Sequence, residues 1–425
     1  MKKIGADDPS QALAELRLRG EYRNFAILRR KPEAPTQASL FGYAGLSAEA
    51  VGDSSAIDAV PERGVSVWCS NDYLGMSRHP LVLAAMKDAL DRSGAGAGGT
   101  RNISGTNIYH VALEKELAEL HNKEAALIFT SGYNANQAAL GVLGHYLKNC
   151  IIYSDRLNHA SMIAGIRASK APCHIWRHND VKQLREMLEA APQDQARLIA
   201  LESVYSMDGD IGPIKEVCDL AEEFGAHVYL DEVHAVGMYG PGGAGVAAQL
   251  GQENRIDIIQ GTLGKAFGIQ GGYIAGSREL IDLVRCFAPD FIFSTALSPV
   301  LAAGALASIR HLRKSETERE GQRRSVEFVK SVLRKKSIPF YDEPTHIVPV
   351  IVEGAASCVS AARMLMTDWN IYVQPIVYPT VPRGTERIRL TPSPQHSPEA
   401  VIALSEALAS VLQTDIVRAA NSHVG

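Results

Sequence analysis

The feature that most constrains the fold is an alternation of short apolar runs with helical patterns between residues 65 and 295. Each run ends near a Gly, Ser or Asp, and amphipathic stretches such as 111–121 and 214–224 lie between the runs. The alternation is typical of a mostly parallel sheet covered by helices on both faces, so we expect an α/β fold. The runs that we interpret as strands are 125–129, 150–153, 198–202, 227–230 and 256–260.

The pattern changes on both sides of this region, and a chain of 425 residues is long enough for two or three domains. Residues 11–30 resemble a basic amphipathic helix, and residues 32–64, rich in Ala, Ser, Pro and Gly, predict an extended connector. After Pro299 a long helical stretch precedes short strands and further helices, which predicts a smaller α+β domain. We therefore divide the chain into residues 1–64, 65–296 and 297–425.

Composition excludes several classes of partner. With 43 Lys and Arg against 47 Asp and Glu, the chain has no basic excess for nucleic acid. The longest apolar stretch, 297–309, is interrupted by Pro299 and two serines and is shorter than the ~20 residues of a membrane span. The N-terminus lacks the apolar core of a secretory signal. Six scattered cysteines without a C-x-x-C pair favour reduced thiols in the cytoplasm, and we expect no metal.

Two motifs that follow buried strands carry the main chemical prediction. Lys265 lies in the run GTLGKAFG, where a buried amine kept partly neutral could act as a nucleophile; the alternative is an exposed loop lysine. Asp231 ends the apolar run VYLD, where a carboxylate could keep a pyridine nitrogen protonated and so make the ring an electron sink. Its alternative role is a helix cap. The pair, with His234 between them, favours the chemical interpretation.

Three weaker motifs accompany this pair. Residues 130–136, TSGYNAN, run from a strand into a helix whose N-terminus could hold a phosphate, or whose first residues are a plain N-cap. His159 in NHAS could stack on a flat cofactor or be a core histidine. Arg387 and Arg389 alternate in a strand, so they share a face where one guanidinium could bind a substrate carboxylate, while Arg387 could instead be a solvated edge residue.

Together these motifs resemble the fold-type I enzymes that use pyridoxal 5′-phosphate, and more narrowly the α-oxoamine synthases, which join an amino acid to an acyl-CoA. The narrower resemblance rests on the runs CSNDYLGM (69–76), GGTRNISGT (98–106) and YPTVPRGTER (378–387), and it covers about residues 12–30 and 65–412. The chain is most similar to the members that condense glycine with succinyl-CoA and release CoA and CO2 to give 5-aminolevulinate. The family also implies a homodimer with an active site at the subunit interface.

The resemblance implies a role for each matching residue. Lys265 would carry the cofactor and act as base and acid, with Asp231 at the ring nitrogen and His159 on the ring face. The other cofactor contacts would be Ser206 and His234 at the phenolic oxygen, Gly132, Tyr133 and Thr262 at the phosphate, and Ser294 and Thr295 from a partner subunit. The substrate contacts would be Asn71 and Arg389 for glycine, and Arg23, Thr100, Asn102 and Thr380 for the succinyl group.

Alternatives remain at this level. The same chemistry could use another acyl-CoA, as in glycine C-acetyltransferase or 8-amino-7-oxononanoate synthase. An inactive scaffold homologue is a different class, but it would be expected to lack Lys265 or Asp231, and both are present. Arg23 is the residue on which acyl selectivity depends, although a surface arginine in a basic helix would look the same. The product could feed haem and other tetrapyrroles or a secondary metabolite.

Overall fold

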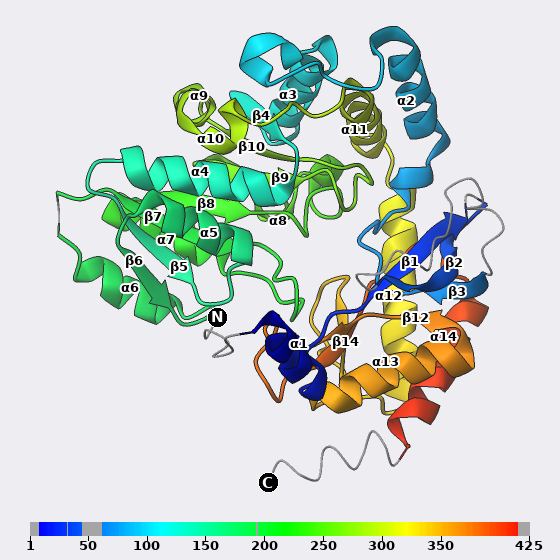
Figure 1. Ribbon diagram of the computed structural model, residues 1–425. Coiled ribbons are helices and arrows are strands. Elements are labelled where there is room, and N and C mark those ends of the chain that lie inside the picture. Colours follow the sequence, from blue (N-terminus) through cyan, green and yellow to red (C-terminus); the bar gives the residue numbers. More distant parts are fainter. Residues whose placement is uncertain (1–7, 32, 45–61, 193, 415–425) are drawn as a thin grey trace. The chain divides into compact units, whose positions relative to one another are not determined.

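The computed structural model describes residues 8–31, 33–44, 62–192 and 194–414 (Figure 1). The chain forms two compact units. The central unit contains Asn71–Ser206 and Asp210–Arg319, and the terminal unit contains the chain up to Ser70, Met207–Gly209 and the chain from Glu320 onward. The three-segment division expected from the sequence stays a prediction about domain organisation.

A seven-stranded sheet forms the middle of the central unit, with the order β4-β10-β9-β8-β7-β5-β6 (Figure 1). Neighbouring strands from β9 to β6 are parallel, whereas β10 is antiparallel to both β4 and β9. This confirms the predicted α/β fold with a mostly parallel sheet. The strands are β4 (Ala125–Phe129), β5 (Ile151–Asp155), β6 (Cys173–Trp176), β7 (Arg197–Glu202), β8 (His227–Asp231), β9 (Ile258–Thr262) and β10 (Gly272–Gly276).

Helices cover both faces of this sheet, and alternate residues of one strand enter different cores. In β4, Ala126 and Ile128 join an apolar cluster with α3 (Ile108–Leu120) and α11 (Pro299–Leu312). Leu127 and Phe129 join another with α4 (Gly132–Tyr146) and α5 (Ala160–Ser169). Double coverage explains why the strands are continuously apolar. The remaining helices of this unit are α2 (Pro80–Ser93), α6 (Val181–Glu189), α7 (Ile214–Phe224), α8 (Val246–Gln249), α9 (Arg278–Phe287) and α10 (Pro289–Ile292), with short helical turns at Met76–Arg78, Arg101–Gly105, Pro241–Gly243 and Glu253–Arg255.

The terminal unit contains two small sheets and the helices packed on them. The four-stranded sheet has the order β1-β2-β3-β12 and the three-stranded sheet the order β11-β14-β13. The strands are β1 (Phe25–Lys31), β2 (Ala34–Ala44), β3 (Arg63–Val67), β11 (Val348–Ile351), β12 (Ile371–Tyr372), β13 (Pro375–Ile376) and β14 (Arg387–Leu390). The helices are α1 (Pro9–Leu18), α13 (Ala355–Trp369) and α14 (Pro398–Leu412), and α12 (Thr317–Lys335) begins in the central unit and continues here.

The structure corrects the sequence prediction near the N-terminus. The helix expected over residues 11–30 ends at Leu18, and Gly20 follows with a φ of 68°, a left-handed conformation that terminates helices. Residues 25–31 are instead the strand β1, paired antiparallel with β2. The predicted connector 32–64 therefore begins with a strand, and its residues 45–61 lie outside the described residues. In the described part of the chain, no helix combines the length and apolar character needed to cross a bilayer.

Candidate active site

A cavity of about 120 Å³ lies in the central unit at the carboxyl ends of β7, β8 and β9. Ligand sites of open α/β sheets form at this edge, because loops there are free to vary while the strands fix their starting points. The lining includes two carboxylates, one lysine and two histidines from segments far apart in the sequence. The lining residues are Gly132, Tyr133, Asn136, His159, Ser161, Glu202, Asp231, Val233, His234, Thr262 and Lys265.

Asp231 is the last residue of β8, and only 4% of it is exposed. Its Oδ2 accepts a hydrogen bond from Asn136 Nδ2 at 2.7 Å, and its Oδ1 accepts one from the Val233 amide at 2.8 Å. Burial raises the pKa of Asp231, while these two hydrogen bonds act in the opposite direction. A protonated ring nitrogen beside this carboxylate would offset its desolvation, so the site fits a pyridinium.

Lys265 follows β9 in a short turn and lines the same cavity as Asp231. Its positive charge acts on three neighbours: it lowers the pKa of Asp231, Glu202 and His159. A lysine within electrostatic reach of two carboxylates in a largely enclosed space differs from an exposed loop lysine. The structure thus brings together the amine and the acid on which the sequence prediction depends.

His159 is the N-cap residue of α5, and its ring faces the cavity. Its amide donates to Glu202 Oε1 at 2.6 Å, and its Nδ1 accepts from the Ser161 amide at 3.2 Å. Burial lowers the pKa of His159, which favours a neutral imidazole although the charge of Asp231 opposes this effect. A neutral ring held at both its backbone and Nδ1 is suited to stacking on a flat cofactor.

The first turn of α4 forms another part of the cavity lining. Gly132 and Tyr133 begin this helix, and the N-cap residue Ser131 accepts from the Asn134 amide at 3.1 Å. The first turn of a helix leaves amide groups without helical partners, and these groups bind phosphate well. The hydroxyl of Thr262 is nearby and is held by the backbone: it donates to Gly271 O at 3.0 Å and accepts from the Gly264 amide at 3.1 Å.

Four residues that line the cavity were not predicted as site residues: Asn136, Ser161, Glu202 and Val233. Glu202 ends the buried strand β7 just as Asp231 ends β8, so the same signal could have identified it. Burial and then the charge of Asp231 raise its pKa well above the usual value. Asn136 lies one turn into α4, where a polar side chain has no distinguishing pattern in a sequence.

Other predicted cofactor residues lie away from this lining. Ser206 is in the loop after β7 and is not among the residues that line the cavity. Ser294 and Thr295 line a separate small cavity, and Thr295 pairs with Thr100 in an isolated β-bridge. The family resemblance implies that these last two belong to the site of a partner subunit. His234 does line the cavity, and its Nδ1 lies 2.8 Å from the hydroxyl of Tyr73.

The predicted substrate residues form pairs within each unit. In the terminal unit, Arg23 Nη2 lies 3.3 Å from Thr380 Oγ1, so two residues distant in sequence are adjacent. In the central unit, Thr100 Oγ1 donates to Asn102 Oδ1 at 2.7 Å. Asn71 in the same unit accepts from the Tyr73 hydroxyl at 3.3 Å.

The two arginines of β14 in the terminal unit are both buried. Arg389 is 7% exposed and Arg387 is 3% exposed. Arg387 makes an ion pair with Asp208 and donates to Met207 O at 3.1 Å. The interpretation of Arg387 as a solvated edge residue is therefore wrong, because β14 is the middle strand of its sheet and the guanidinium is paired beneath the surface.

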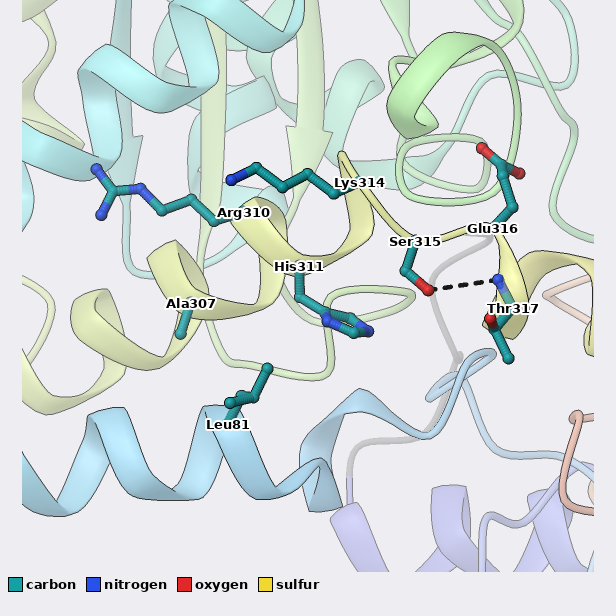
Figure 2. A pocket seen from close by; sticks show the side chains of 8 residues that line it. All are labelled: Leu81, Ala307, Arg310, His311, Lys314, Ser315, Glu316 and Thr317. Carbon is teal, nitrogen blue, oxygen red and sulfur yellow. Dashed lines mark hydrogen bonds between the residues drawn. The ribbon is translucent and has the colours of Figure 1, made fainter.

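A larger cavity of about 630 Å³ lies beside α2 and α11 in the central unit (Figure 2). Its charged groups are exposed or already paired: Arg310 binds Glu116 at 2.8 Å, and Glu316 pairs with Arg319. Figure 2 shows Arg310 and Lys314 pointing away from His311 rather than converging on one point. None of the residues that line this cavity is a buried carboxylate, whereas Asp231 and Glu202 of the smaller cavity are, so we place the active site in the smaller cavity.

Comparisons with known proteins agree with this geometry. The family model described as aminotransferase class I and II matches residues 63–408. The 5-aminolevulinate synthase of Rhizobium meliloti is 54% identical over 392 residues, which are 92% of this chain and 93% of that protein. The corresponding enzyme of Paracoccus denitrificans is 52% identical over 403 residues, covering 94% and 95%. A serine palmitoyltransferase structure from S. paucimobilis, bound to a pyridoxal phosphate aldimine, superposes with a TM-score of 0.85 at 28% identity and covers 98% of both chains.

The fold and the cavity define a fold-type I enzyme whose cofactor is pyridoxal 5′-phosphate. Within aminotransferase class I and II, the chain belongs to the family of the 5-aminolevulinate synthases. The residues present fit the cofactor, since a buried carboxylate, a lysine, a neutral histidine and a helix N-terminus surround one cavity.

Proposed function

We propose that this protein condenses glycine with succinyl-CoA to give 5-aminolevulinate, with release of CoA and CO2. The product is a precursor of haem and other tetrapyrroles. The observation that carries the proposal is the shared lining of one cavity by Lys265, Asp231 and His159, in a chain more than half identical to 5-aminolevulinate synthases.

The chain's own groups would divide the work around the bound cofactor. Pyridoxal phosphate supplies an electron sink that stabilises negative charge at the α-carbon of glycine. Asp231 would keep a proton on the ring nitrogen, because a cation beside its buried carboxylate offsets the cost of removing that carboxylate from water. Lys265 takes the α-proton of glycine and later returns a proton to the same carbon. His159 holds the ring plane, and the first turn of α4 holds the phosphate.

Selection of succinyl-CoA would depend on its terminal carboxylate. An apolar pocket could not require that group, whereas a guanidinium with neighbouring hydroxyl and amide groups can, since a smaller acyl group would leave those groups unpaired. The pair of Arg23 and Thr380 supports this proposal, as does the hydrogen-bonded pair of Thr100 and Asn102. Asn71 and Arg389 would bind the carboxylate of glycine.

The functional unit would be a homodimer in which Ser294 and Thr295 complete the phosphate site of the other subunit. Three exposed apolar side chains support a second copy of this chain as the partner. They belong to the segments around Thr100 and Ser294, and they are Ile103 (78% exposed), Ile108 (76%) and Phe293 (80%). Exposed apolar side chains of this size are typical of interfaces between subunits. We propose the cytoplasm as the location, on the basis of the cysteine pattern of the sequence.

A comparison of acyl donors tests the proposed function. Purified holoenzyme should turn over glycine with succinyl-CoA much faster than with acetyl-CoA or octanoyl-CoA. An Arg23→Gln variant should lose selectivity by raising the KM for succinyl-CoA, while the KM for glycine stays near that of the wild type. Equal or faster turnover with acetyl-CoA would instead assign the chain to another acyl-CoA specificity within the same chemistry. No turnover with any donor by a protein that holds the cofactor would refute the enzymatic proposal.

A further inference from the structure

His178 in the central unit bridges two carboxylates outside the cofactor cavity. It lies just after β6, in the run RHND that the assigned site residues do not include. Its Nδ1 is 2.9 Å from Asp155 Oδ1, and its Nε2 is 2.7 Å from Asp210 Oδ2. Both ring nitrogens therefore face acceptor oxygens, an arrangement in which each nitrogen carries a proton. The residue forms a cation between two anions.

Each carboxylate belongs to a turn that leads to a predicted cofactor residue. Asp155 ends β5, and its oxygens also accept from the amides of Leu157 at 2.8 Å and Asn179 at 3.0 Å. This turn continues directly into His159. On the other side, the backbone of Asp210 accepts from the Tyr205 amide at 3.0 Å and so closes the hairpin that carries Ser206.

The charges in this cluster explain why a histidine is needed. The side chain of Asp155 is fully buried and that of Asp210 is 18% exposed, so the two carboxylates that contact the His178 ring have limited access to water. Burial lowers the pKa of His178, but its hydrogen bonds and the charges of both carboxylates outweigh this effect and raise the pKa to about 10. The ring also lies edge-on to Tyr205, with centroids 4.4 Å apart. A neutral side chain would leave the carboxylates uncompensated.

We propose that His178 is a positioning residue, which links the turn carrying His159 to the hairpin carrying Ser206 and so keeps the His159 ring at the cofactor cavity. It does not line the cavity and takes no part in proton transfer. The inference rests on the cofactor contact of the proposed function, and it does not depend on which acyl-CoA the protein uses. The turn and the hairpin follow different strands, so the link has to be made by side chains.

The test compares His178→Gln with a matched control, His227→Gln. His227 pairs with Asp257 at 2.8 Å, but at the amino end of β8 and away from the cavity. In the holoenzyme at pH 7, His178→Gln should release the cofactor at least tenfold faster than the wild type. Amide hydrogen exchange should accelerate in peptides covering 155–161 and 203–212 while the rest of the sheet keeps its protection. The control should match the wild type in both measurements.

A double variant separates positioning from general stability. His178→Gln with Asp210→Asn removes one cation and one anion, so it should regain at least half of the lost cofactor retention. Wild-type cofactor release by His178→Gln would overturn the proposal. Uniformly faster exchange across the whole central unit, without recovery in the double variant, would also overturn it, because that result indicates a general structural role. Failure of the wild type to make 5-aminolevulinate would refute the proposed function alone and leave these measurements unaffected.

Discussion

Removal of Asn136 tests how the protein keeps Asp231 charged. Asn136 is 1% exposed, and its Nδ2 lies 2.7 Å from Asp231 Oδ2. A hydrogen bond to a charged group contributes about 1.5–3 kcal/mol, and about 1.4 kcal/mol corresponds to a tenfold change in an equilibrium constant. Asn136→Ala should therefore raise the pKa of Asp231 further and weaken cofactor binding by about 10- to 150-fold.

The assay is a titration of apoprotein with pyridoxal phosphate, followed by absorbance, with kcat/KM measured on the same samples. Tyr229→Phe is the matched control, because the Tyr229 hydroxyl donates to Asn136 Oδ1 at 2.7 Å, so its removal leaves the hydrogen bond from Asn136 to Asp231 in place. The control should bind the cofactor within about threefold of the wild type. If Asn136→Ala binds the cofactor as tightly as this control, the hydrogen bond to Asp231 does not set the affinity, and the reasoning is refuted.

Three further predictions concern stability and assembly. His121 is buried, and burial lowers its pKa to about 3. Between pH 6.5 and pH 3 the unfolded state therefore binds a proton that the folded state does not, so the free energy of unfolding should fall with decreasing pH by up to about 1.4 kcal/mol per pH unit. Urea unfolding at pH 5 and pH 7 should show a smaller dependence on pH for His121→Gln than for the wild type. Arg387→Ala should lower the free energy of unfolding by about 2–3 kcal/mol, because it leaves Asp208 without its partner; a loss below 0.5 kcal/mol would contradict the importance of this pair. A mixed dimer of one Lys265→Ala subunit and one Thr295→Ala subunit should contain one intact active site and so recover activity, measured per dimer. Failure of the mixed dimer to recover activity would contradict an active site shared between subunits.

The sequence predicted the central sheet well because its strands are buried on both faces and therefore read as continuous apolar runs. The apolar pattern does not predict the strand β6, because three of its four residues are exposed. It does not predict β10 either, because glycine and alanine interrupt the apolar run. The region of β1 was misassigned to a helix because several of its residues are also compatible with a helix. The pairing of β1 with β2 makes this segment a strand, and a local sequence pattern does not show which segments pair.

The residues of the candidate site likewise include some that the sequence predicts and some that it does not. Asp231 and Lys265 were predictable because a charged residue at the end of a buried strand has few structural reasons to be there. Asn136 and His178 were not, since their importance comes from contacts with Asp231, Asp155 and Asp210, which lie on other elements. The sequence therefore identified groups that line the cavity, and the structure was needed for the residues that hold those groups in place.

The most direct test of the central claim is to find which lysine carries the cofactor. The holoenzyme is reduced with borohydride, which fixes pyridoxal phosphate to the amine that holds it, and is then digested and mapped by mass spectrometry. We predict that the modified peptide contains Lys265, and that Asp231→Asn lowers its yield by weakening cofactor binding. Attachment to a different lysine in the unmutated protein would contradict the account.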